Sequence, residues 1–280
     1  MTSIAHAATA ANAVVAANHW RSPTGVTTQD KNVQELWNIT FYFAIPLGLI
    51  VIGLIIFCIV RYRKRPADHP RGGRKPSQFQ YHIPLEVAYT VIPIVIVAIV
   101  FGFMYKAEDR IDYVAKNPPV QIKVEGFQWG WRFTYLTVQG NGANQHPDFQ
   151  VVGSVANEPD INNQSDLPVM VLPVGQTVQF DLYTDDVNHS FYIPATLFKR
   201  DLIKGVANKV DMNFTKTGTF FGECTQFCGT YHPYMRFNVQ VEPADQFLSW
   251  VASKKPNSIA YAGTTQGAGV SPNAFSGGHP

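Results

Sequence analysis

Two cysteines, a histidine and a methionine lie within twelve positions of a chain that has three cysteines in all: Cys224, Cys228, His232 and Met235. The spacing of the two thiols alone is also typical of a disulfide in an oxidising exterior, of packed free thiols, or of a thioredoxin-like copper chaperone. The neighbours change this interpretation, because thiolate, thioether and imidazole together form the ligand set that selects copper. We therefore expect a copper-binding loop.

A second imidazole is expected from elsewhere in the chain. Mononuclear blue-copper sites combine a Cys-His-Met loop with a histidine from an earlier strand end, and His189 in DDVNHSFYIP has that place. The additional cysteine, Cys224, departs from the mononuclear pattern. Two thiolates on one loop can each bridge two metal ions, which predicts a compact dicopper centre with one histidine per copper and a weak terminal ligand on each.

Two long apolar segments precede this region. Residues 36–60 contain no charged residue, and residues 86–107 include the uncharged run from Val87 to Tyr105. At a helical rise of about 1.5 Å per residue, both can cross a hydrocarbon layer of about 30 Å. Pro93 is tolerated in a membrane helix that has neighbours. We predict two transmembrane helices that return the chain to the side where it began.

The charge distribution predicts which side of the membrane each loop and terminus lies on. The loop at 61–85 carries basic residues against a single acidic one, Asp68, so the positive-inside rule places it in the cytoplasm. The basic residues are Arg61, Arg63, Lys64, Arg65, Arg71, Arg74 and Lys75. Both termini are then external. The net charge of +2 is too small to indicate a nucleic-acid binder.

The region from Lys116 to Asp245 is acidic, with thirteen Asp and Glu residues against nine Lys and Arg. An acidic outer face favours a basic soluble partner. Short alternating apolar runs separated by Gly, Pro, Asn and Asp predict an all-β sandwich or barrel of Greek-key type at 115–245. The external segment at 1–35 gives a weak signal-peptide pattern without a basic start, and the Gly- and Ser-rich tail at 246–280 is expected to be mostly flexible.

The order of these features resembles subunit II of the heme-copper cytochrome c oxidases over about Leu36 to Glu242. The residues that carry the resemblance are the two-helix hairpin, then FQWGWRFTY, then Asp-Val-x-His-Ser, then Cys-x-x-x-Cys-x-x-x-His-x-x-Met. The resemblance implies a multi-pass protein of the bacterial plasma membrane with a membrane α hairpin and an external cupredoxin-like sandwich. It also implies electron transfer from cytochrome c, or a cytochrome c domain, to heme in a catalytic subunit I, with oxygen reduced to water and protons translocated.

The resemblance implies a binuclear CuA centre of two copper ions. Its ligands in this chain would be His189, Cys224, Cys228, His232, Met235 and the backbone carbonyl of Gln226. Many family members have Glu at the position of Gln226, where the side chain reaches a magnesium ion at the contact with subunit I. Glutamine weakens the case for that ion, so magnesium is not predicted.

The resemblance also implies roles for two further residues. Trp129, the first tryptophan of FQWGW, would be the exposed aromatic over the copper site where electrons enter, although two alternating tryptophans in a strand most often serve packing. The acidic neighbours of His189, Asp185 and Asp186, suit a basic donor there. Gly130 lies where relatives often have an aromatic residue, which leaves the shape of the path open.

Glu86 is the only carboxylate near the cytoplasmic start of the second predicted helix. A carboxylate at a membrane helix end often lies at the interface without a function. In the family, a glutamate at this point marks the mouth of a proton channel that leads into subunit I, and we predict that role for Glu86.

Several other functions share parts of the pattern. A quinol-oxidase subunit II lacks the copper ligands, and a nitrous oxide reductase has a propeller and no membrane hairpin. A thioredoxin-like copper chaperone would place helices between its strands. The remaining alternative is a membrane-anchored copper electron-transfer or copper-delivery protein. Other oxidase subunits and membrane lipid are the expected partners besides cytochrome c.

Overall fold

The computed structural model describes residues 24–63, 80–140, 143–154 and 167–262. Most of the predicted segment at 1–35, the basic residues from Lys64 to Lys75 and the tail beyond residue 262 lie outside the described residues. The described chain forms two compact units: a helical unit within residues 32–110, and a β unit that combines residues 24–31 with residues from 111 onward.

The helical unit consists of two long apolar helices, α2 Asp30–Arg61 and α3 Ile83–Ile111. Each extends beyond the predicted span at both ends, and each is long and apolar enough to cross a membrane. Pro46 and Pro93 lie within the helices, as membrane helices permit. The Arg110 guanidinium donates to Asn32 Oδ1 over 3.1 Å, which joins one end of α3 to one end of α2.

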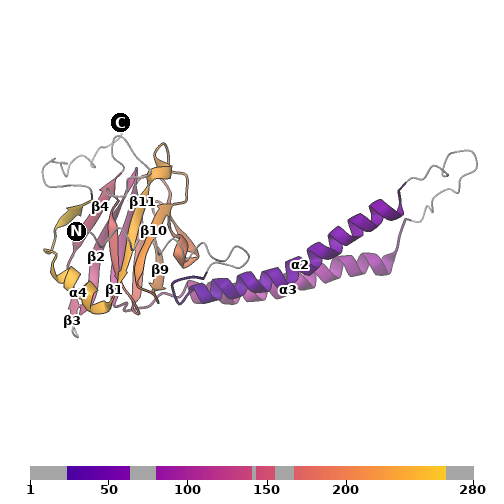
Figure 1. The fold of residues 1–280 in the computed structure, drawn as a ribbon, viewed down its shortest axis with the longest axis horizontal. Coiled ribbons are helices and arrows are strands. Elements are labelled where there is room, and N and C mark those ends of the chain that lie inside the picture. Colours follow the sequence, from indigo (N-terminus) through magenta and orange to yellow (C-terminus); the bar gives the residue numbers. More distant parts are fainter. Residues whose placement is uncertain (1–23, 64–79, 141–142, 155–166, 263–280) are drawn as a thin grey trace, which may run out of the picture. The chain divides into compact units, whose positions relative to one another are not determined.

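The β unit is a sandwich of two sheets (Figure 1). In the described residues, the larger sheet has the order β12-β4-β2-β1-β6-β9, with β3 paired to β2. Its strands are β1 Val120–Phe127, β2 Gly130–Gly140, β3 Ala143–Gln145, β4 Phe149–Ser154, β6 Thr177–Tyr183, β9 Asn208–Asn213 and β12 Ile259–Tyr261. The smaller sheet has the order β5-β11-β10-β7-β8. Its strands are β5 Val169–Pro173, β7 His189–Ile193, β8 Phe198–Leu202, β10 Gly218–Cys224 and β11 Arg236–Glu242.

The topology follows from crossovers between the sheets. Strands β1 and β6 pair in parallel, and so do β5 and β11, while β1 with β2 and β10 with β11 form antiparallel pairs. Alternate residues of the strands point inward, so that β1 shows a strict buried-intermediate alternation. The predicted architecture, a membrane α hairpin followed by an all-β Greek-key sandwich, is confirmed.

Aromatic side chains fill the space between the sheets. The rings of Phe191 and Phe237 stack with centroids 5.2 Å apart, and Trp131 meets Phe237 edge-on at 5.1 Å. The largest fully buried side chains include Trp131, Phe133, Tyr135, Phe149, Phe180, Phe191, Phe214, Phe237 and Phe247. This core supports the ends of β7 and β10, which carry His189 and Cys224.

The β unit continues beyond the predicted boundary at residue 245. Helix α4 Ala244–Ala252 buries Phe247 and Val251 in the core, and β12 pairs in parallel with β4. Residues 246–261 therefore belong to the packed domain, and the flexible tail predicted at 246–280 begins too early. The Gly-, Ser- and Asn-rich composition of the tail predicted a flexible segment, although Phe247 and Val251 are spaced four residues apart, as on one face of a helix.

The segment before α2 also belongs to the sandwich. The Val26 N–H donates to the Ala195 carbonyl over 3.1 Å, and Thr27 forms an antiparallel bridge with Phe214. The buried Asp30 carboxylate accepts the Thr27 N–H over 2.7 Å. The last part of the predicted external segment is thus fixed to the β unit by backbone hydrogen bonds.

Candidate metal centre

The distant histidine of the predicted site begins strand β7. His189 is fully buried, and its Nδ1 lies 3.8 Å from Cys224 Sγ. Strand β1 of the other sheet has Gly126 at this point, where an added Cβ would come within 3.1 Å of the His189 ring. The imidazole is therefore held between a glycine and the sulfur of the predicted metal loop.

The metal loop, residues Cys224–Met235, joins β10 to β11. Its two ends are tied together because the Cys224 N–H donates to the Met235 carbonyl over 3.0 Å. Within the loop, Gly229 adopts φ +118, a conformation that favours glycine, and the short helix η3 His232–Tyr234 returns the chain toward Met235. Because the loop is closed, its candidate metal-donor groups lie close together although they are separated in the sequence.

The two thiol sulfurs lie at the centre of the candidate metal site. Cys224 Sγ lies 3.9 Å from Cys228 Sγ and 3.2 Å from the Gln226 carbonyl oxygen. Cys228 Sγ lies 3.4 Å from His232 Nδ1 and 3.8 Å from Met235 Sδ. All six predicted ligand groups therefore lie next to one of the two sulfurs.

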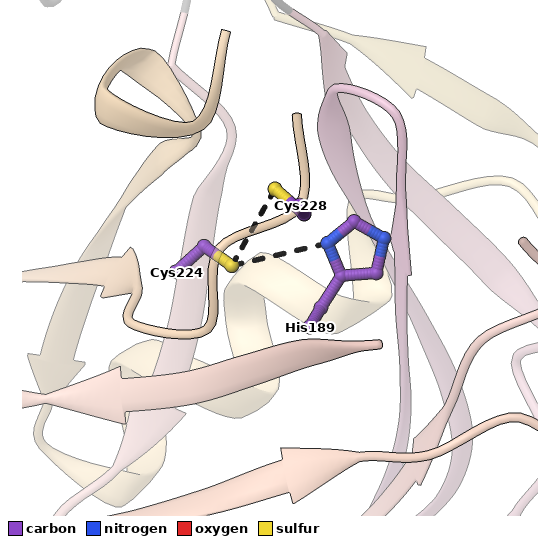
Figure 2. Close-up of side chains that lie close together, drawn as sticks. All are labelled: His189, Cys224 and Cys228. Atoms are coloured by element: carbon purple, nitrogen blue, oxygen red, sulfur yellow. Dashed lines mark hydrogen bonds between the residues drawn. The ribbon is translucent and has the colours of Figure 1, made fainter. Parts of the chain in front are cut away.

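Figure 2 shows that the Cys224 sulfur lies between His189 and Cys228. The ligand atoms of these three residues all lie within 4.8 Å of one another. The two cysteines are free thiols, and their separation is far beyond the S–S bond length of about 2.05 Å. The disulfide interpretation of the spacing is not realised here.

The local electrostatics favour cation binding. The hydrogen bond between the thiols lowers the pKa of Cys224 and raises that of Cys228, since burial disfavours a second thiolate beside the first. Burial also disfavours the charged form of His189, but hydrogen bonds with Cys224 and Asp186 outweigh it and raise the pKa of the imidazole. A metal cation would displace these protons and compensate both thiolates.

The donor set fits copper. Two thiols, two imidazole nitrogens and a thioether are soft or borderline ligands, and Cys224, Cys228 and Met235 are buried. The residues present therefore suit copper.

The two tryptophans of FQWGW have different surroundings. Trp129 is half-buried, and its Nε1–H donates to the Cys228 carbonyl over 3.1 Å. Its ring meets that of Tyr231 edge-on at 4.9 Å. Trp131 is fully buried, and its Nε1 donates to the Met235 carbonyl over 3.3 Å. Trp129 is thus the tryptophan that combines contact with the metal loop and access to solvent.

Asp186 makes contacts in the structure that were not predicted from the sequence. Its Oδ1 lies 2.9 Å from His189 Nε2, and its carboxylate also accepts the N–H groups of Gln128 and Val187. Burial disfavours the carboxylate, but these hydrogen bonds together lower the pKa of Asp186. Asp186 therefore orients the histidine, while Asp185 accepts a hydrogen bond from the Tyr183 hydroxyl.

Gln128 was not singled out from the sequence. Its Nε2 donates to the Cys228 carbonyl over 2.7 Å, although the two residues are 100 positions apart.

The other predicted site residue, Glu86, belongs to the helical unit and lies in the first turn of α3. Its Oε1 accepts the His82 N–H over 3.0 Å. Glu86 thus caps its own helix and is not part of the metal cluster.

Comparisons with known proteins agree with this description. The family model "Cytochrome C oxidase subunit II, periplasmic domain" matches residues 120–242, and "Cytochrome C oxidase subunit II, transmembrane domain" matches residues 20–105. Cytochrome c oxidase subunit 2 of Corynebacterium glutamicum is 32% identical over 272 residues, which cover 84% of this chain and 76% of the relative. A probable cytochrome c oxidase subunit 2 of Streptomyces avermitilis is 32% identical over 269 residues, with 87% and 82% covered.

Among solved structures, the periplasmic domain of subunit II of cytochrome oxidase from Bradyrhizobium japonicum is similar to part of the chain. The sequence identity is 28%, the TM-score is 0.42, and the match covers 50% of this chain and 96% of that one.

Proposed function

The chain belongs to the cytochrome c oxidase subunit II family, and from this premise we propose that electrons from a cytochrome c, or a cytochrome c domain, enter a respiratory terminal oxidase through it. Heme in the catalytic subunit receives the electrons, and oxygen is reduced to water there with coupled proton translocation. The observation that carries the proposal is the convergence of four further donor groups on the two adjacent thiol sulfurs.

The proposed metal site holds two copper ions. Its ligands are His189, Cys224, the Gln226 carbonyl, Cys228, His232 and Met235. These residues would hold the two ions, and the bound copper would supply a one-electron redox couple.

The chain's own residues keep the site rigid and partly dry. Trp131 and Phe237 pack beneath the metal loop, and the Met235 carbonyl accepts from both Cys224 and Trp131. A loop closed by these bonds changes little in shape when the charge of the site changes, and a buried site requires little solvent rearrangement. Both properties suit fast transfer of an electron in and out.

Trp129 is the proposed point of electron entrance. Its indole contacts both solvent and the Cys228 carbonyl, so one ring connects the surface with a ligand residue. Asp185 and the net negative charge of the β unit suit a basic electron donor on the same face. The acidic Asp186 contributes to this field while it holds His189 in place.

The proposed location is the bacterial plasma membrane, with the two helices in lipid and both termini and the β unit outside. The support is the basic composition of the loop at 61–85. Glu86 then lies at the cytoplasmic end of α3, where we place the mouth of a proton channel. A carboxylate can exchange protons, whereas an amide cannot at neutral pH.

The metal proposal is tested by measuring the copper content and the optical spectrum of the purified full-length chain. We expect two copper ions per chain and the purple colour of a mixed-valence dithiolate centre. One copper per chain with a blue mononuclear spectrum would contradict the proposal. Two copper ions that transfer to another protein and do not cycle between redox states would favour a copper-delivery protein.

The proton proposal is tested with Glu86→Gln in the assembled oxidase. Glutamine keeps an oxygen that accepts the His82 N–H, so the start of α3 is preserved while the exchangeable proton is lost. We expect unchanged copper content and slower proton-dependent reduction of the catalytic centre. The matched control is Glu108→Gln, near the other end of α3. Reduction kinetics equal to wild type would leave Glu86 as a helix cap alone.

A further inference from the structure

The turn between β1 and β2 touches both segments that carry metal ligands. Gln128 in this turn donates its backbone N–H to Asp186 Oδ2 over 2.7 Å and its side-chain Nε2–H to the Cys228 carbonyl over 2.7 Å. The other oxygen of Asp186, Oδ1, lies 2.9 Å from His189 Nε2. One residue thus connects the metal loop with the carboxylate that orients the distant histidine.

The contacts of Gln128 link Cys228 to the His189 side of the site, which strand pairing does not do. Strands β7 and β10 pair at Glu223 with Tyr192 and at Cys224 with Phe191, and the last backbone hydrogen bond of this pairing is a long one, from the Thr225 N–H to the Ser190 carbonyl over 3.4 Å. Cys228 lies four residues beyond Cys224, and no strand pair fixes its distance to His189. Besides the contacts through Cys224, hydrogen bonds between loops therefore help to set this distance.

The contact between the turn and the loop is close. A Cβ added at Gly229 would lie 3.1 Å from Gln128 Nε2 and 3.0 Å from the Trp129 ring. The carbonyl that precedes Gly229 accepts from both residues, over 2.7 Å from Gln128 and 3.1 Å from Trp129. The shorter of these two bonds belongs to Gln128, which also reaches the histidine side of the site.

We propose that Gln128 is a positioning residue for the metal centre: it holds Cys228 in register with His189, so that both sides of the site are in place before metal binds. This inference rests on the proposed copper site and adds a residue that is not a ligand to it. The amide is suited to the task because it donates to a carbonyl without carrying charge. Residues that hold metal ligands typically change metal affinity by about 10-fold to 100-fold when they are replaced.

The test compares Gln128→Leu and Gln128→Glu with wild type in the full-length chain. Leucine removes the donor, whereas glutamate places a carboxylate against the Cys228 carbonyl and beside Asp186. The matched control is Gln121→Leu on β1, which removes a hydrogen bond to Asp181 away from the site. We expect copper retention against a chelator to fall by about 10-fold in Gln128→Leu and further in Gln128→Glu, with wild-type retention in the control.

A second measurement needs no metal. In the copper-free chain, we expect Cys228 to react faster with a thiol reagent in Gln128→Leu than in wild type or in Gln121→Leu. Copper retention, spectrum and thiol reactivity all equal to wild type would overturn the inference while leaving the copper site intact. A wild-type chain without two copper ions would instead refute the proposed function on which the inference rests.

Discussion

The metal-loop region and the aromatic cluster around Tyr135 both contact strand β2, the first through Trp131 and the second through Tyr135 itself, but they are stabilised differently. In the metal-loop region, Cys228 and the Asp186 that contacts His189 are each held by one hydrogen bond from Gln128, and the ligand atoms of His189, Cys224 and Cys228 lie within 4.8 Å of one another. In the aromatic cluster, the ring of Tyr135 stacks on Phe149 with centroids 4.6 Å apart, and Trp250 of α4 meets both rings at 5.3 Å.

The two regions differ in whether their polar side-chain atoms already have all their bonding partners. The single polar side-chain atom of the Tyr135 ring is satisfied, because its hydroxyl donates to the Val171 carbonyl and accepts the Val171 N–H, each over 2.9 Å. Close sulfurs and imidazoles, in contrast, have protons that a metal can replace. Substitutions in the metal-loop region should therefore change copper chemistry, and substitutions in the aromatic cluster should change stability.

The largest effect is expected from replacing either bridging thiol. In Cys228→Ser or Cys224→Ser, one remaining thiolate cannot hold both ions, so the binuclear absorption spectrum should disappear completely. The control is Cys58→Ser, which removes the exposed free cysteine of α2 and should leave the spectrum unchanged. The measurements are copper content and the optical spectrum. A binuclear spectrum that survives in either serine variant would show that the sulfurs do not bridge.

The next effect separates the two tryptophans. Trp129→Leu removes the half-buried ring but leaves Gln128 bonded to the Cys228 carbonyl, so electron uptake from cytochrome c should slow sharply while the copper spectrum stays unchanged. Stopped-flow reduction of the oxidase measures the rate. Trp131→Leu is the comparison: it opens a cavity in the core and should lower the free energy of unfolding by about 3 kcal/mol. If a folded Trp131→Leu variant slowed electron uptake as much as Trp129→Leu, the assignment of Trp129 as the entry point would be wrong.

The candidate donor residues could be recognised in the sequence more readily than the residues that surround them in the fold. Four donors fall within one loop of twelve residues, so their types and spacing were sufficient to indicate copper. Gln128 could not be found in this way, because its partners lie 58 and 100 positions away and depend on how loops of two sheets meet. Asp186 was noticed as an acidic neighbour of His189, but its direction toward the imidazole is a property of the folded loop.

The fold shows the same division. Long uncharged runs made the two helices predictable, and alternating apolar residues made the sandwich predictable. The extension of the domain to Tyr261 was missed because α4 is short and β12 has three residues, so neither gives a strong periodic signal.

A smaller effect is expected in the aromatic cluster. Tyr135→Phe keeps the ring packing but leaves the buried N–H and carbonyl of Val171 without their side-chain partner. The cost is about 2 kcal/mol of unfolding free energy, because unsatisfied buried groups lose about 1–3 kcal/mol. Thermal unfolding of the β unit measures the loss, and the copper spectrum should be identical to wild type. A changed spectrum would mean that the two regions are coupled along β2.

The smallest effect is expected from Met235→Leu, which tests whether the metal-loop region depends on the thioether or on the backbone that carries it. The Met235 side chain is buried with its Sδ 3.8 Å from Cys228 Sγ, whereas its carbonyl accepts from Cys224 and Trp131. Leucine fills a similar volume and keeps both backbone bonds, so the loop should stay closed and retain two copper ions. Loss of a weak axial ligand should then shift the reduction potential and move the absorption bands slightly. A redox titration followed optically measures both changes, and loss of either copper ion would show that the thioether, rather than the closed loop, holds the site together.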